Sequence, residues 1–213
     1  MTEKHVVNIW ENWSKKRKAY PVYDNWLDKY KDLFETYKEE EFLDLGCGLG
    51  ADTAYLIERG YQVLSCDIAY EALKNIEDNI LNSKTLRMDM TLPFPIESNS
   101  YSVIIADLSL HYFNERDTIH IMEEIKRLLK PGGVLLARVA RVDDYHFGAG
   151  VGKELEKNFY FEGDYYKRFF DDEDIQKFFS IIGEVTSVKT SMTREEEEYQ
   201  QEKQLFEVQV IKI

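Results

Sequence analysis

The sequence is poor in cysteine, proline and glycine, and it is short of positive charge. Among 213 residues it holds 2 Cys, 4 Pro and 11 Gly, and 27 basic side chains stand against 40 acidic ones, for a net charge of −13. Cys47 and Cys66 are too few for a disulfide framework, and they are not spaced with histidines as zinc ligands are. Low glycine and proline exclude collagen-like and linker compositions. We therefore expect an ordinary folded chain with free thiols and no metal site.

Long apolar runs are also lacking. None approaches the ~20 residues that a membrane-spanning helix needs, and no apolar segment near the N-terminus precedes a small-residue cleavage site. We expect a cytoplasmic protein without a membrane partner. Basic side chains cluster only at 15–18, and a chain this acidic is repelled by a phosphate backbone. Nucleic acid is therefore not expected as a partner.

What the chain does have is the material for one core. Hydrophobic residues make up 44% and aromatic residues 14%, and a single domain of this length buries roughly 70% of its unfolded surface. Up to about Tyr37, aromatic and apolar residues fall at helical spacing, with a break at Tyr20-Pro21. This pattern predicts one or two amphipathic helices.

From Glu41 onward, short apolar runs alternate with helical stretches, a pattern that is typical of a parallel α/β sheet. The predicted strands are Phe42–Leu45, Gln62–Cys66, Lys84–Met88, Ser102–Ala106 and Val134–Val139. The predicted helices between them are Ala51–Arg59, Tyr70–Asn79 and Arg116–Leu129, the last ending at Lys130-Pro131-Gly132-Gly133.

The alternation is interrupted by a long insertion, Asp143–Phe170, that is dense in tyrosine, phenylalanine and acidic residues. Insertions of this length in a compact domain are usually functional. A helix over Asp172–Phe179 follows, capped by Asp171, and two antiparallel strands near Glu184–Ser191 and Leu205–Ile213 complete the chain. The acidic run Glu195–Glu198 between those strands is predicted to be a solvated loop.

The most informative segment is the apolar strand that runs directly into Gly46-Cys47-Gly48-Leu49-Gly50. A glycine turn at the end of a first parallel strand lets a ligand approach the backbone closely. The next strand ends in Asp67, where a carboxylate can accept hydrogen bonds from ribose hydroxyls. Gly46, Gly48 and Ala51 also satisfy the dinucleotide fingerprint. These residues alone leave a nicotinamide cofactor and an adenosyl cofactor both open.

Further motifs favour one of the two. Leu43-Asp44-Leu45-Gly46-Cys47-Gly48-Leu49-Gly50, Asp67, Met88-Asp89-Met90 and Leu129-Lys130-Pro131-Gly132-Gly133 resemble, in order and spacing, the class I methyltransferases that depend on S-adenosylmethionine. The resemblance covers roughly residues 39–139. It implies a single α/β domain with a doubly wound, mostly parallel seven-stranded sheet, an antiparallel C-terminal strand and an N-terminal helical cap. Within residues 1–213 it implies a cap at 1–38, a cofactor-binding core at 39–139, a substrate lid at 140–170, and a C-terminal helix and hairpin at 171–213.

The resemblance also implies roles for single residues toward S-adenosylmethionine, whose demethylated product is S-adenosylhomocysteine. Asp44 and the backbone of Gly46 would hold the methionyl end, with Cys47 in the same turn and Gly48 leaving room for the cofactor. Asp67 would bind the ribose hydroxyls and Ile68 would pack on the adenine. The adenine amino group would meet Asp89, with the Met90 backbone beside it, and Asp107 would line the pocket near the sulfonium. Because this cofactor carries net positive charge, acidic groups around it make electrostatic sense.

Methyl transfer from a sulfonium is an in-line displacement that depends mainly on positioning. If the acceptor loses a proton, His111 is the candidate catalytic base, although it could equally pack against the cofactor or cap a helix. Arg138 and Arg141 could pair with a substrate anion or form surface salt bridges. Aromatic candidates for a lid over a small-molecule substrate are Tyr20, Tyr23, Trp26, Tyr145, His146, Phe147, Tyr165 and Tyr166.

Three alternative functions and the oligomeric state remain open at this point. An NAD-dependent dehydrogenase would use the same glycine turn, and a non-catalytic module would keep the adenosyl-cofactor fold without turnover. An aminopropyl transferase would need an additional acidic set near the fourth strand, where only Asp107 is found. Exposed aromatic faces would serve a lid or a dimer equally well, so a monomer and a homodimer both remain open.

Overall fold

The computed structural model describes residues 3–17, 19–193 and 201–213, and it confirms the predicted fold class. Seven strands form one sheet in the order β3-β2-β1-β4-β5-β10-β9. Pairing is parallel from β3 to β5, and β10 is antiparallel to both of its neighbours. The strands are β1 (Glu41–Leu45), β2 (Gln62–Asp67), β3 (Lys84–Arg87), β4 (Tyr101–Asp107), β5 (Leu129–Ala140), β9 (Gly183–Met192) and β10 (Lys203–Lys212).

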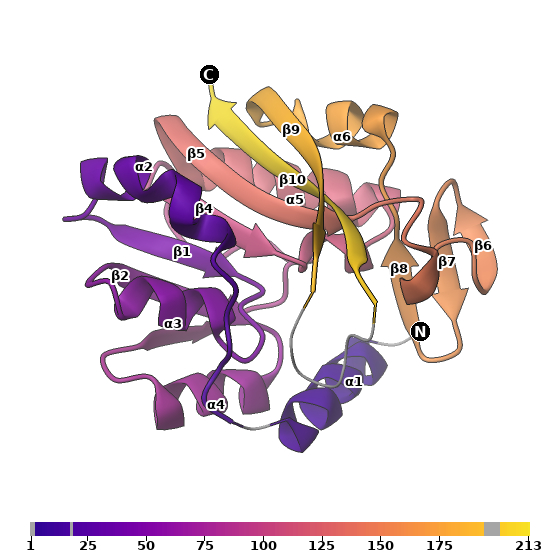
Figure 1. Cartoon of the computed structure of the whole chain (residues 1–213), viewed down its shortest axis with the longest axis horizontal. Coiled ribbons are helices and arrows are strands. Elements are labelled where there is room, and N and C mark those ends of the chain that lie inside the picture. The colour runs from indigo at the N-terminus through magenta and orange to yellow at the C-terminus, as the bar shows by residue number, and fades with distance from the viewer. Residues whose placement is uncertain (1–2, 18, 194–200) are drawn as a thin grey trace.

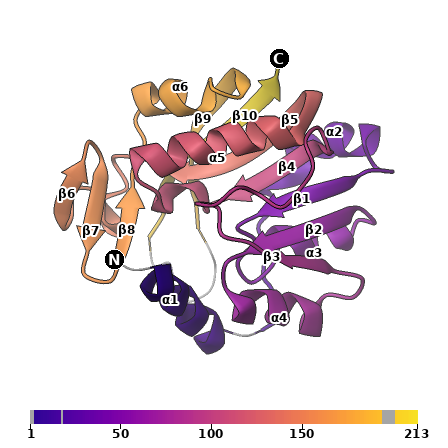
Figure 2. The same cartoon turned by 180° about the vertical axis from the view of Figure 1, so that it is seen from behind.

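Helices cover both faces of this sheet because both faces are apolar (Figures 1 and 2). The helical elements η1 (Trp26–Tyr30), α2 (Lys31–Thr36), α3 (Ala51–Ile57) and α4 (Tyr70–Asn79) lie on one face. The opposite face is covered by α5 (Glu115–Leu128) and α6 (Asp172–Phe179). Asp171 caps α6 as predicted, since its carboxylate accepts a hydrogen bond from the backbone N–H of Asp174 at 2.8 Å.

The predicted helix stop at Lys130-Pro131-Gly132-Gly133 takes a different form in the structure. α5 ends at Leu128 and β5 begins at the next residue, so these four residues belong to the strand. They interrupt the β4–β5 register, because Tyr101 pairs with Leu129 whereas Val103 pairs with Val134. The proline and the glycines therefore make a bulge inside β5 instead of a separate turn.

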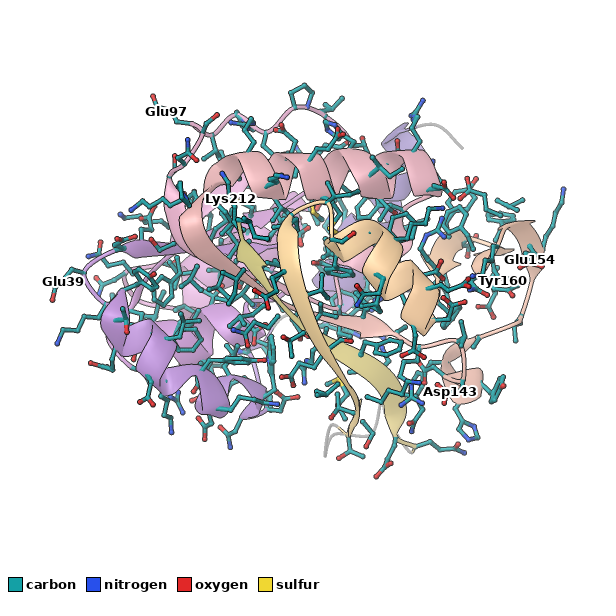
Figure 3. All side chains as sticks on the ribbon, turned by 90° about the horizontal axis from the view of Figure 1, so that it is seen from above. Glu39, Glu97, Asp143, Glu154, Tyr160 and Lys212 are labelled. Carbon is teal, nitrogen blue, oxygen red and sulfur yellow. The ribbon has the colours of Figure 1, made fainter. Side chains whose placement is uncertain are left out.

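Two additions to the sheet gather at the carboxyl ends of its parallel strands (Figures 1 and 2). The first is α1 (Glu3–Lys16), which packs against α4. The second is the insertion, which holds the short 3₁₀ helix η3 (Tyr145–Phe147) and a three-stranded antiparallel sheet of β6 (Lys153–Glu156), β7 (Phe159–Glu162) and β8 (Tyr165–Arg168). Glu154 and Tyr160 of this small sheet lie at the opposite end of the molecule from Glu39, which precedes β1 (Figure 3).

The small sheet was not anticipated, because its strands of four residues each are too short for alternation to be distinctive. Its anchor is Arg168, a buried guanidinium that donates to Glu156 Oε2 at 2.7 Å and to the Phe113 carbonyl at 3.2 Å. Glu156 also accepts from the backbone N–H of Glu115 at 2.8 Å, which ties the sheet to the start of α5.

Some expectations lie outside the described residues, namely the acidic run Glu195–Glu198 and Lys18 of the basic cluster. None of the described helices has the length and apolarity that crossing a lipid bilayer would require.

Candidate functional site

The glycine turn after β1 is tied directly to the end of β2. The backbone N–H groups of Gly46 and Cys47 both donate to the Cys66 carbonyl, at 2.8 and 3.0 Å. The Gly48 N–H donates to Asp67 Oδ2 at 3.0 Å. Gly46 and Gly48 have φ values of +75° and +51°, which residues other than glycine rarely adopt. The turn and Asp67 therefore form one preorganised unit.

These groups line a cavity of about 1870 Å³ at the carboxyl ends of β1, β2 and β4. In open α/β sheets a ligand binds where the strand order reverses, which in this sheet is between β1 and β4. The cavity exceeds the ~300–1000 Å³ typical of a site for one small ligand, so it has room for two molecules. It brings together every residue that the resemblance assigned to a cofactor: Asp44, Gly46, Cys47, Gly48, Asp67, Ile68, Asp89, Met90 and Asp107.

Asp44 lies at the base of the cavity and is almost fully buried. Its Oδ2 accepts a hydrogen bond from the Thr53 hydroxyl at 2.6 Å, and Thr53 lies 2.7 Å from the Ser65 hydroxyl. Burial raises the pKa of Asp44 to about 7, opposed by Thr53 and reinforced by the negative charges of Asp107 and Asp67. A cation bound beside it would favour the ionised form.

Asp67 and Asp89 both use carboxylate oxygens to order the backbone around them. Asp67 Oδ1 accepts from the Ala69 N–H at 2.8 Å, in addition to the bond from Gly48 to its other oxygen. Burial raises the pKa of Asp67, although these backbone N–H groups oppose the rise. Asp89 Oδ1 accepts from the backbone N–H and the hydroxyl of Thr91, both at 2.8 Å. Asp89 therefore also stabilises its own turn.

Arg138 is not the surface residue that was expected. Its side chain is only 5% exposed, and it donates to both carboxylate oxygens of Asp107, at 2.6 and 2.8 Å, and to Asp24 at 2.7 Å. Its guanidinium lies 4.6 Å from the centre of the Trp26 ring. Burial alone would lower the pKa of Arg138, but Asp107 and Asp24 raise it above its ordinary value. Arg138 therefore forms a buried salt bridge, and the expected surface salt bridge at this residue is wrong. Arg141 pairs with Asp143.

His111 does not reach the cavity. It is fully buried, packs against the Tyr112 ring at 4.5 Å, and neither ring nitrogen has a hydrogen-bond partner among the described residues. Burial lowers the pKa of His111 well below its ordinary value, helped by the nearby Lys167 and Lys203. The short 3₁₀ helix η2 (Leu110–Tyr112) places Tyr112 in the cavity wall instead. This geometry gives no support to a role for His111 as the catalytic base.

The aromatic wall differs from the expected lid. Of the eight predicted lid residues, Tyr20, Tyr23 and Tyr166 line the cavity, whereas Tyr145, His146, Phe147 and Tyr165 do not. Trp26 packs over Arg138 beside the cavity. The wall also contains aromatic side chains that were not singled out from the sequence: Trp10, Trp13, Tyr112, Phe113 and Phe159. The signal that could have found the first two is their spacing of three residues in an amphipathic helix.

Asp52 is the functional candidate that sequence reasoning missed. It lies in the first turn of α3, where an acidic residue is commonly explained by the helix dipole. In the structure it is buried and lines the cavity with Asp44. Across the described residues, no group of three or more His, Cys, Asp or Glu side chains is arranged to hold a metal ion.

Comparisons with known proteins find methyltransferases. A protein-family profile described as a methyltransferase domain matches residues 43–137. The chain is 30% identical over 123 residues to the putative methyltransferase YqeM of Bacillus subtilis, covering 55% of this chain and 49% of that protein. It is 27% identical over 154 residues to the tRNA N(3)-cytidine methyltransferase METTL2 of Xenopus tropicalis, covering 66% and 46%. The chain thus spans about half the length of these curated relatives.

Solved structures show the same fold at low sequence identity. One is a SAM-dependent methyltransferase from Methanosarcina mazei, with a TM-score of 0.70 and 18% identity over 85% of this chain and 97% of that chain. Another is the 1,6-didemethyltoxoflavin-N1-methyltransferase of Burkholderia thailandensis, with a TM-score of 0.64 and 16% identity over 98% and 86%. Its structure contains bound 1,6-didemethyltoxoflavin and S-adenosylhomocysteine.

Two glycine substitutions test the geometry of the turn. A Cβ at Gly46 would lie 2.4 Å from the Ser109 Cβ, whereas a Cβ at Gly48 would meet nothing within 4 Å. We expect Gly48→Ala to lower the free energy of unfolding by only ~1 kcal/mol, because the backbone of Gly48 has a left-handed φ that alanine adopts at a cost. Gly46→Ala adds overpacking and should lower it by about 3 kcal/mol. Urea denaturation of the two variants measures both values, and equal losses would contradict this description of the turn.

Proposed function

We propose that this chain is a class I S-adenosylmethionine-dependent methyltransferase and that it transfers the methyl group of S-adenosylmethionine to a small organic acceptor. The observation that carries the proposal is the composition of the cavity. Among the described residues that line it, eight are acidic and three are lysine or arginine. An acidic cavity favours a ligand with net positive charge and disfavours the pyrophosphate of a nicotinamide cofactor.

The residues present fit S-adenosylmethionine along its length. Asp44 and the Gly46 backbone would hold the methionyl end, and the open space at Gly48 would admit the centre of the molecule. Asp67 retains lone pairs for the ribose hydroxyls after accepting two backbone N–H groups. Ile68, Asp89 and Met90 would surround the adenine, and Asp107, held by Arg138, would lie near the sulfonium.

When bound, the cofactor supplies an electrophilic methyl group, and the chain supplies position and exclusion of water. Nucleophile and methyl carbon must approach within about 3 Å on the side opposite sulfur, so a rigid wall contributes directly to the rate. The Trp10 ring lies 4.6 Å from the Tyr112 ring, which joins α1 to η2 across the cavity. Glu11 holds α1 in place by accepting from the backbone N–H groups of Tyr70 and Glu71, both at 2.9 Å.

The wall away from the glycine turn supports a flat acceptor. It includes the aromatic side chains of Trp10, Trp13, Tyr112, Phe113 and Phe159, which offer large contact areas at low cost in entropy. Its two acids already have partners: Asp117 accepts from Asn114 at 2.8 Å and Glu156 accepts from Arg168 at 2.7 Å. The neighbour from Burkholderia thailandensis holds 1,6-didemethyltoxoflavin together with S-adenosylhomocysteine, so this fold accommodates a small organic ligand.

The expectation that nucleic acid is no partner is not supported by the comparisons, because the relative from Xenopus tropicalis acts on tRNA. For this chain, the net charge of −13 and the acidic cavity support a small acceptor, since a tRNA backbone would be repelled. We accordingly keep the absence of a nucleic-acid partner as part of the proposal.

The first test is cofactor binding by the purified chain. S-adenosylmethionine in hundredfold excess over its Kd should stabilise the fold by ~2.7 kcal/mol, and NAD should not. Asp67→Ala should abolish the thermal shift because the ribose hydroxyls lose their acceptor, whereas the exposed Glu97→Gln should keep it. Circular dichroism confirms that the variants are folded. A shift that Asp67→Ala leaves unchanged would refute the ribose assignment, and a shift with NAD would overturn the choice of cofactor.

The second test follows from the titration of Asp44. Since its pKa is raised to about 7 in the empty protein, a fraction of Asp44 is protonated near neutral pH and must release its proton when a cation binds. Affinity for S-adenosylmethionine should therefore rise about tenfold from about pH 5.5 to about pH 7. Asp44→Asn should flatten this dependence. Calorimetric titration at several pH values measures it, and an affinity that falls over this range would contradict the sign.

The third test addresses the acceptor. The purified chain is incubated with methyl-labelled S-adenosylmethionine and either bulk tRNA or the low-mass fraction of a cell extract, filtered through a membrane that retains tRNA. We expect label in products of the low-mass fraction, because the aromatic wall encloses a small molecule. Label transferred to tRNA and not to the low-mass fraction would contradict a small-molecule acceptor.

A further inference from the structure

Asp52 is a buried carboxyl group with one hydrogen bond from the described residues. It is 6% exposed and lies in the first turn of α3, directly after the glycine turn. The Trp26 indole N–H donates to its Oδ1 at 2.9 Å. Oδ2 has no hydrogen bond or ion pair within the described part of the chain, and the residue lines the cavity. A carboxylate oxygen without a protein partner on a cavity wall can pair with a cationic ligand.

The charges around Asp52 leave it without a cation of its own. The groups that influence it come from every neighbouring element: Asp44 on β1, Asp107 on β4, Arg138 on β5 and Trp26 on η1. Arg138 is the only cation in this set, and it is engaged by two bonds to Asp107 and one to Asp24. Within the described part of the chain, the donors to Asp44 and Asp52 are therefore neutral: the hydroxyl and backbone N–H of Thr53 for Asp44, and the Trp26 indole for Asp52.

The protein's own groups therefore leave this wall short of positive charge. Burial raises the pKa of Asp52 well above its ordinary range, and the negative charges of Asp107 and Asp44 raise it further, against the opposing effect of Arg138 and the Trp26 hydrogen bond. Two uncompensated carboxyl groups in one buried wall are stabilised by a ligand that brings two positive centres. S-adenosylmethionine carries two, an ammonium and a sulfonium, whereas S-adenosylhomocysteine keeps only the ammonium.

We propose that Asp44 and Asp52 divide these two charges between them, with Asp44 facing the ammonium and Asp52 facing the sulfonium. Asp52 is then the residue that distinguishes the charged methyl donor from its neutral thioether product. This inference rests on the proposed function, since it requires S-adenosylmethionine in the cavity. After transfer, the charge opposite Asp52 is gone, which favours release of the product.

Two isosteric variants test this division, each with both ligands. Asp52→Asn should weaken binding of S-adenosylmethionine about tenfold or more and change binding of S-adenosylhomocysteine by less than about twofold, because only the former has a sulfonium. Asp44→Asn is the matched comparison and should weaken both ligands, because both have the ammonium. Glu97→Gln removes an exposed negative charge and should change neither. Calorimetric or fluorescence titration gives the four affinities.

Equal weakening of both ligands by Asp52→Asn, or no weakening, would overturn the inference while leaving the proposed function intact. If the wild-type chain binds neither ligand, the proposed function itself fails. The Asn variant keeps the acceptor oxygen for Trp26, and its thermal unfolding without ligand shows whether it folds.

A measurement on the wild-type chain gives the same answer without any substitution. The ratio of S-adenosylmethionine affinity to S-adenosylhomocysteine affinity should fall as pH decreases, because protonated Asp52 cannot favour the sulfonium. A ratio independent of pH would contradict the assignment of Asp52.

Discussion

The proposed cofactor site depends on one buried wall in which several carboxyl groups lie close together. Asp44, Asp52 and Asp107 line this wall together, and burial disfavours the charged form of Asp44 and of Asp52. Arg138 neutralises part of this charge through its two bonds to Asp107. What remains is a site that is less stable empty than it would be with a cation bound. The proposed cofactor and its charge selectivity both follow from that imbalance.

Sheet topology explains how residues distant in sequence come to share this wall. The strand order reverses between β1 and β4, so the loops that follow these strands diverge and leave a crevice between them. The N-terminal segment closes one side because three of its residues are bound to the core. Trp26 donates to Asp52, Asp24 accepts from Arg138, and Tyr23 donates to Glu58. The cap and the charged wall are therefore one hydrogen-bonded network, and a change in either affects both.

The sequence pattern predicted those parts of the site whose geometry depends only on residues close to one another in the chain. A glycine turn after a strand and a strand-final carboxylate need only their neighbours, and the cavity contains Gly46, Gly48 and Asp67 with the other six residues that the resemblance to class I methyltransferases implied. Long-range pairing was not visible in the sequence. Arg138 is buried because it pairs with Asp107 and Asp24, which lie in other segments of the chain. His111 turns away from the cavity because the short helix η2 presents Tyr112 instead. Asp52 lies in the wall and accepts from Trp26 of another segment, and no local pattern in the sequence indicates that position.

The most direct measurement is a crystal structure of the chain with S-adenosylhomocysteine. The account predicts the ribose hydroxyls within about 3 Å of the Asp67 carboxylate, the amino-acid end at the Gly46 turn beside Asp44, and the sulfur on the side of Asp52 and Asp107. It would be contradicted by a turn blocked by side chains, by a ligand bound outside this cavity, or by a sulfur atom that faces away from both carboxyl groups.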